Sequence, residues 1–113
     1  MSPKDKVLVW LKTEIKTPPF SKEARIEAGY LLRLLQQGHN LSIPQSKKLS
    51  DLCSRCHMLR IKDKDTWYRI IYRIDPDAIV LLHVFEKKSD KISKSILKTC
   101  KQRIKQYDED SKS

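Results

Sequence analysis

Three arginines stand where an alternating pattern would place them on one face of a β-sheet. Residues 57–62 and 67–74 alternate in side-chain direction with the period of two that strands impose. Guanidinium groups bind phosphate through paired hydrogen bonds and stay charged at physiological pH. A solvated face with ion pairs to nearby aspartates is the structural alternative. The pattern favours a phosphate-binding sheet face that carries Arg60, Arg69 and Arg73.

Lysines extend this positive charge. Lys62 is two positions after Arg60 and so shares its face of the strand. The pair Lys87 and Lys88 comes just after the apolar run 78–85. Five more lysines recur at helical spacing, which places them on one side of a helix. Like charges at these spacings repel each other, so binding to a phosphate backbone is the preferred explanation and a solvated face the alternative. This lysine stripe consists of Lys91, Lys94, Lys98, Lys101 and Lys105.

Acid–base chemistry has four candidate side chains: His57, His83, Tyr72 and Tyr107. Each is more simply explained as a packed or capped residue. Alternation puts His57 on the side of its strand opposite to Arg60, and the neighbours of His83 favour a core histidine. The sequence shows no serine–histidine–aspartate array, glycine-rich phosphate loop or paired-carboxylate site.

The string CSRCH at 53–57 has the spacing of a covalent haem attachment site. No export signal accompanies it, and Met58 is too close to His57 to bind the opposite side of a haem iron. A zinc site could be assembled by adding His83 and Cys100, but a second closely spaced ligand pair is missing. We therefore expect no metal and no cofactor, and we expect the three cysteines to be reduced thiols.

Hydrophobic periodicity, helix-capping residues and turn residues predict the helices and strands that would position these side chains. Ser21 is a suitable N-cap, with Glu23 in the first helical turn, and Gly38 is a suitable stop. Ser89 or Asp90 can cap the last helix. The expected elements are a strand at 6–11, a helix at 21–38, a loop at 39–54, strands at 57–62, 67–74 and 78–85 joined by turns at 63–66 and 75–77, a helix at 91–107 and a frayed tail at 108–113.

This order predicts an α+β fold: a small, mainly antiparallel four-stranded sheet with an N-terminal helix and a C-terminal helix. We expect the helices mainly on one face of the sheet, which leaves the other face for a ligand. The 113 residues suit a single domain, 1–113. The net charge of +10 favours nucleic acid, an acidic protein or an anionic surface as partner. No apolar run reaches the ~18 residues of a membrane span, so we expect a cytoplasmic protein without a membrane partner.

Several segments follow one another in a recognisable order. They are LRI at 59–61, YRIIYR at 68–73, an aspartate-containing turn, IVLLHVF at 79–85, a lysine pair and a basic helix. TPPFS at 17–21 and AGYLL at 28–32 precede them. Together they resemble the RelE/HigB superfamily of bacterial type II toxins, and most closely its phage-derived branch. The resemblance covers nearly the whole chain and implies a RelE-like toxin domain.

The resemblance implies a ribosome-dependent, metal-independent endoribonuclease that inhibits translation. Such toxins cut mRNA by attack of a ribose 2′-hydroxyl on the adjacent phosphate, which requires cations and proton transfer at that phosphate. The implied catalytic positions are Arg60, Arg73, Lys87 and Lys88, with His57, Lys88 or Tyr107 as the general base. The implied RNA-binding positions are Arg69, Lys62, Lys91, Lys94 and Lys98.

The implied partners are mRNA on the ribosome and a HigA-like helix-turn-helix antitoxin that covers the basic face. The alternative is a non-catalytic protein of the RelE/ParE fold that binds nucleic acid or a topoisomerase.

Overall fold

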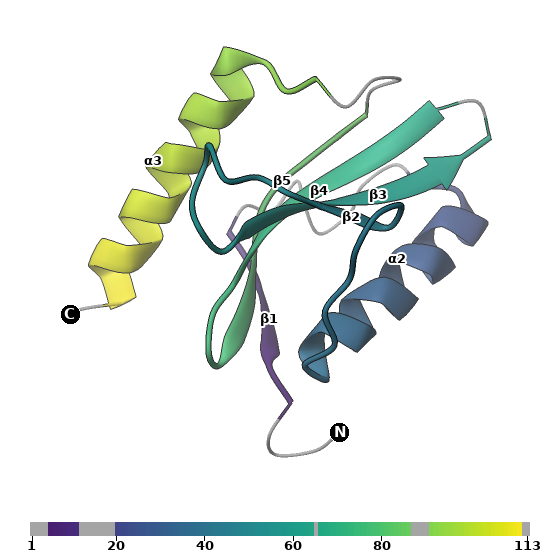
Figure 1. Ribbon diagram of the computed structural model, residues 1–113, viewed down its shortest axis with the longest axis horizontal. Helices are drawn as coiled ribbons and strands as arrows, with labels where there is room; N and C mark the ends of the chain where they lie inside the picture. Colours follow the sequence, from purple (N-terminus) through teal and green to yellow (C-terminus); the bar gives the residue numbers. More distant parts are fainter. Residues whose placement is uncertain (1–4, 12–19, 65, 87–90, 112–113) are drawn as a thin grey trace.

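A five-stranded mixed sheet forms the centre of the protein, as seen in a computed structural model that describes residues 5–11, 20–64, 66–86 and 91–111 (Figure 1). The strand order is β1-β5-β4-β3-β2, with β1 parallel to β5 and the other neighbours antiparallel. The elements are β1 (Val7–Trp10), α2 (Lys22–Gln36), β2 (Ser46–Lys48), β3 (Cys56–Asp63), β4 (Thr66–Ile74), β5 (Ala78–Glu86) and α3 (Lys94–Ser111).

The alternation read from the sequence sets the register of the β3–β4 hairpin. Arg60 pairs with Arg69 and Lys62 pairs with Trp67, so these side chains project from the same face. The three strands expected at 57–62, 67–74 and 78–85 are confirmed, and each ends within one residue of its predicted bounds.

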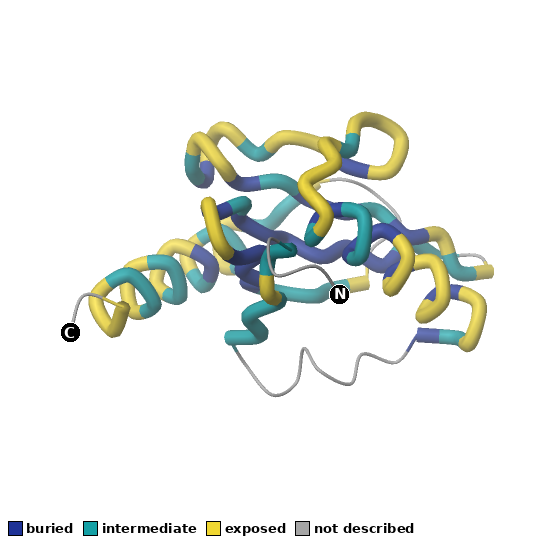
Figure 2. The backbone as a smooth tube through the Cα atoms, turned by 90° about the horizontal axis from the view of Figure 1, so that it is seen from below, coloured by how far each residue is buried: buried dark blue, intermediate teal, exposed yellow. Residues whose placement is uncertain are grey.

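The two helices cover opposite faces of the sheet (Figure 1). The apolar side of α2 packs with one set of strand residues and that of α3 with the alternate set, exemplified by Ile70 and Ile71 in β4. The expectation of both helices mainly on one face is therefore wrong. The helices lie on opposite faces because β4 and β5 carry buried side chains on both sides, including Ile70 and Ile71 of β4, so each face of the sheet needs a cover. Figure 2 shows this arrangement, with buried strands in the centre and exposed residues along both helices.

The expected four-stranded sheet lacks one strand that the structure contains. β2 lies within the segment 39–54, which the sequence suggested was a loop, and its residue Ser46 pairs with Leu59 of β3. The Ser46 and Tyr72 hydroxyl groups lie 2.7 Å apart in a hydrogen bond and help to hold β2 on the sheet. Three polar residues carry no apolar alternation, so β2 gave no signal in the sequence.

Helix α2 begins and ends as predicted. The Ser21 hydroxyl accepts a hydrogen bond from the backbone N–H of Ala24 at 3.1 Å, which makes Ser21 the N-cap. Gly38 follows the helix with φ of +91°, a conformation that glycine adopts without steric cost.

Helix α3 begins and ends later than predicted. Ser93 caps it by accepting a hydrogen bond from the N–H of Ile96 at 3.2 Å. The earlier cap candidates, Ser89 and Asp90, lie outside the described residues. The helix continues through Ser111 and so includes residues 108–111, for which fraying stays a prediction. No helix among the described residues is both long and apolar enough to cross a bilayer.

Candidate RNA-binding surface

Trp67 is surrounded by three cations at the start of β4. The Arg60, Lys62 and Arg69 side chains carry charges 5.1, 5.9 and 6.0 Å from the centre of the Trp67 ring. The cross-strand pairs Arg60–Arg69 and Lys62–Trp67 bring them together. Cations near the face of an indole are attracted by its electrons, which holds the group together despite its like charges. We call these four residues the Trp67 cluster.

The arginines of the Trp67 cluster differ in exposure. Arg60 is half-buried, and its Nη1 atom donates to the carbonyl of Pro44 at 3.4 Å. Arg69 is only 1% exposed, and its Nη1 donates to the carbonyl of Trp67 at 3.3 Å. Arg69 therefore does not lie on an open face of the sheet, whether phosphate-binding or solvated. Arg60 and Lys62 are the cluster's cations that a phosphate can reach directly.

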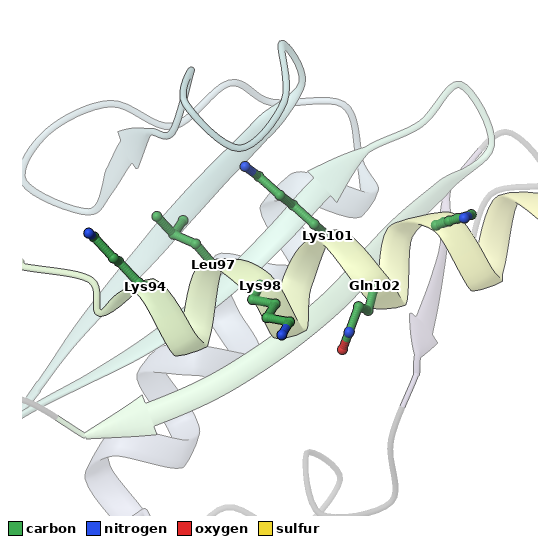
Figure 3. Close-up of a pocket in the computed structure, with 6 residues that line it drawn as sticks. Lys94, Leu97, Lys98, Lys101 and Gln102 are labelled. Atoms are coloured by element: carbon green, nitrogen blue, oxygen red, sulfur yellow. The ribbon is translucent and has the colours of Figure 1, made fainter.

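The lysine stripe lies along the outer side of α3. Lys94, Lys98, Lys101 and Lys105 line a shallow pocket of about 470 Å³ together with Leu97 and Gln102 (Figure 3). The four lysines are exposed, and Lys91 is exposed just before the helix. The inner side of α3, including Ile96, Cys100 and Ile104, packs on the sheet as the apolar stripe predicted. The geometry thus presents several cations to solvent from one rigid element.

Arg73 lies in a buried ion-pair cluster instead of on an open face. It donates to the Asp75 carboxylate at 2.8 and 2.9 Å, and to the Asp108 carboxylate at 2.8 and 3.1 Å. Its guanidinium also lies 5.8 Å from the centre of the Tyr107 ring. The hydrogen bonds to Asp108, reinforced by Asp75, raise the pKa of Arg73 against the opposing effect of burial. The alternative considered for Arg73, an ion pair with a nearby aspartate, is present at Asp75, but the side chain is buried and does not lie on an open sheet face.

His57 lies on the face opposite to the Trp67 cluster, as alternation predicted. Its ring stacks on Tyr72 with centres 5.4 Å apart, and its Nδ1 atom lies 3.2 Å from the carbonyl oxygen of Arg55. Partial burial lowers the pKa of His57, the charge of Lys48 lowers it further, and the contact with Arg55 opposes them. Burial also raises the pKa of Tyr72.

The predicted catalytic residues therefore fall into separate places. Arg69 and Arg73 are four residues apart on β4, or about 13 Å along the strand. Arg60 belongs to the Trp67 cluster, Tyr107 contacts Arg73, and His57 lies across the sheet. Lys87 and Lys88 lie outside the described residues. The structure thus unites Arg60, Lys62 and Arg69 but not the full predicted set.

A family model described as "Phage derived protein Gp49-like (DUF891)" matches residues 18–105, most of the chain. The chain belongs to this phage-derived family. The family is RelE-like and toxin-like, so the resemblance found in the sequence is supported at that level. No curated protein and no solved structure matches the chain. The matched stretch of this Gp49-like protein contains the whole Trp67 cluster and the lysine stripe.

The cysteines of the Gp49-like protein do not follow the expectation of three reduced thiols. Cys53 and Cys56 form a disulfide with their Cα atoms 5.2 Å apart, a geometry that the turn before β3 permits. Cys100 is a free thiol, and burial raises its pKa to about 11. Among the described residues, no three His, Cys, Asp or Glu side chains come together to hold a metal ion. The zinc set that includes His83 is therefore not assembled there.

Two kinds of site residue escaped sequence reasoning in the Gp49-like protein. The sequence pattern identifies Trp67 only as the first residue of a strand, although an aromatic residue facing a lysine across a hairpin suggests a stacking position. Glu23 and Glu27 of α2 line a pocket with Arg60, Lys62 and Trp67, and nothing in the sequence linked that helix to the hairpin. Their contribution depends on tertiary structure.

Proposed function

We propose that this Gp49-like protein is the toxin of a type II toxin–antitoxin system and inhibits translation by cutting mRNA on the ribosome. The observation that carries this proposal is the Trp67 cluster. An accessible aromatic ring stacks on RNA bases, and adjacent guanidinium and ammonium groups bind phosphates. Nucleic acids and nucleotides combine planar rings and phosphates at such short spacing, so the cluster fits a ligand of this class. The lysine stripe of α3 adds cations that could attract the rest of the strand.

Cleavage in this proposal is a transesterification within the RNA. The ribose 2′-oxygen forms a bond to the adjacent phosphorus as the bond to the 5′-oxygen breaks, which leaves a 2′,3′-cyclic phosphate and a 5′-hydroxyl. The 2′-hydroxyl must lose a proton and the leaving oxygen must gain one. Arg60 is the proposed cation that stabilises the pentavalent phosphate, and buried Arg69 adds positive potential beneath it.

The proton-transfer groups are proposed to be Lys87 and Lys88. They follow Glu86 in the chain, and Glu86 pairs with Tyr68, the neighbour of Trp67. His57 and Tyr107 are less suitable, because one lies across the sheet and the other contacts Arg73. A helix-turn-helix antitoxin that covers the Trp67 cluster and the lysine stripe is the proposed partner.

A second candidate is a non-catalytic protein of the same fold that binds RNA. One observation favours it: His57 and Tyr72 stack on the opposite face of the sheet and Tyr107 contacts Arg73, so these three acid–base candidates lie away from the Trp67 cluster. His83 is the exception, because it stacks on Phe85, the cross-strand partner of Arg69. Such a protein would block translation while leaving the message intact, or would leave translation unaffected.

Cell-free translation tests the proposal. The purified chain should stop protein synthesis, and Arg60→Ala and Trp67→Leu should each require roughly 10- to 100-fold more protein for the same inhibition, since each removes phosphate or base contacts. Arg25→Ala, which removes an exposed charge from α2, is the matched control and should inhibit like the wild type. Normal synthesis at a large excess of the folded wild-type chain would reject the toxin assignment.

A further inference from the structure

A second pocket lies beside the Trp67 cluster, at the edge of β3 where β2 begins. It measures about 390 Å³, within the range of small-ligand sites. Trp67, Arg60 and Lys62 line its strand side, and Glu23 and Glu27 line its helix side. The pocket therefore combines a planar aromatic wall, two cationic donors and two carboxylate acceptors.

The carboxylates are held in place by the start of α2. The backbone N–H of Ser21 donates to the Asp63 carboxylate at 3.0 Å, which ties the first turn of the helix to the end of β3. Hydrogen bonds from the Ser21 side chain and backbone lower the pKa of Asp63 and keep it an acceptor. Glu23 and Glu27 are one helical turn apart, so they lie on the same side of α2. Both therefore reach the pocket from a fixed element.

Two carboxylates beside a phosphate-binding cluster require an explanation. In an RNA-binding protein with a net charge of +10, acids at the binding surface repel phosphates and weaken binding. Hydrogen bonding to a base offsets that repulsion, because a carboxylate accepts from the N–H groups of a base edge.

We infer that this pocket binds a guanine base of the RNA, an inference that rests on the proposed function. Guanine has two adjacent donors, N1–H and N2–H₂, which suit a carboxylate of Glu23 or Glu27. Its O6 and N7 atoms are acceptors that suit Arg60 or Lys62. Adenine, cytosine and uracil each have a single donor group on the pairing edge, so none of them offers a carboxylate two adjacent donors. Trp67 or the Arg60 guanidinium provides the stacking surface.

Binding of short RNAs tests the inference. Oligouridylates of one length, with a central uridine, guanosine, adenosine, cytidine or inosine, are titrated with the full chain and followed by fluorescence anisotropy. We expect the guanosine oligomer to bind about 10-fold more tightly than all-uridine RNA, as one good base contact allows. Inosine lacks the N2 amino group and should lose most of that preference.

Matched variants assign the preference to the pocket. Glu23→Ala with Glu27→Ala should abolish the guanosine preference and leave all-uridine binding equal or tighter. The control, Asp51→Ala with Glu109→Ala, removes two exposed acids from elsewhere and should keep the preference. A preference that survives in the Glu23/Glu27 variant overturns the inference.

The failures of the two proposals can be told apart. Equal binding of all the oligomers, or tighter binding of another base, overturns the guanine pocket and leaves RNA binding standing. If no oligomer binds, RNA recognition fails, and the guanine pocket fails with it.

Discussion

Arg73 is most simply explained as a structural residue. Its side chain is 6% exposed and lies between Asp75 and Asp108, whose side chains are 12% and 45% exposed. Removing this buried cation leaves the Asp75 and Asp108 carboxylates near each other, and the exposed Arg55, 3.6 Å from Asp75, offsets only part of the loss. The position therefore links the β4–β5 turn to the C-terminal part of α3.

The first prediction follows from this cluster. Arg73→Ala should lower the free energy of unfolding by about 3 kcal/mol, the low end for a broken buried pair, since solvent screens the half-exposed Asp108. Urea unfolding measures it. Asp108→Asn should cost clearly less than Arg73→Ala. A folded Arg73→Ala protein of unchanged stability that has lost its activity would instead assign Arg73 to catalysis.

His57 provides a prediction about pH. Its pKa in the folded chain is below the usual 6.5, so the unfolded chain takes up the proton first as pH falls. The contribution of neutral His57 to stability is therefore complete above pH 6.5 and is lost as pH falls from there through the folded-state pKa. Between pH 7.5 and 5.5, the wild type should lose stability relative to His57→Gln in urea unfolding. A constant difference over this range would contradict the direction of the pKa shift.

At the residue scale, the sequence predicted on which face of the sheet a side chain lies better than it predicted the burial and the partners of that side chain. Alternation placed Arg60 and Arg69 correctly on one face and His57 on the other. The burial of Arg73 could not be predicted from the sequence. Its partner Asp108 is 35 positions away in the chain and reaches it only through the packing of α3. The pocket acids Glu23 and Glu27 escaped for the same reason: their proximity to Trp67 depends on tertiary structure.

At the element scale, α3 combines an apolar inner side with a cationic outer side. Ile96, Cys100 and Ile104 pack on the sheet, while the lysine stripe faces outward (Figure 3). The period of 3.6 made both sides visible in the sequence. The short strand β2 has no such period. The sequence of β5 is apolar on both sides, but the arginines of β4 concealed that this strand is also buried on both sides, so the need for a helix on each face was not predicted.

A prediction for α3 concerns the salt dependence of RNA binding. Each phosphate contact to single-stranded RNA contributes about 0.7 to the slope of log K against log salt concentration. Lys98→Gln and Lys101→Gln should each lower the magnitude of that slope by about this amount, as measured by anisotropy titrations at several salt concentrations. Arg25→Gln on α2 should leave the slope unchanged. Unchanged slopes in both lysine variants would remove α3 from the RNA-binding surface.

At the scale of the whole molecule, the fold places positive charge on the face that α3 covers only in part. The Trp67 cluster and the core residues under α3 share this face of the same strands: Arg60 is two positions from Met58, and Arg69 is two positions from Ile71. The sequence predicted an α+β fold and a basic sheet face. It did not predict the mixed sheet, because the parallel pairing of β1 with β5 depends on the long path of the chain through α2, β2, β3 and β4.

The central claim is that the Gp49-like protein cuts mRNA during translation through the Trp67 cluster. Mapping the 5′ ends of a defined message after cell-free translation tests it most directly. We predict new 5′-hydroxyl ends within the coding region, formed with the wild type and Arg25→Ala but reduced at least 10-fold with Arg60→Ala. An intact message under complete inhibition by the wild type, or equal cleavage by folded Arg60→Ala, would contradict the account.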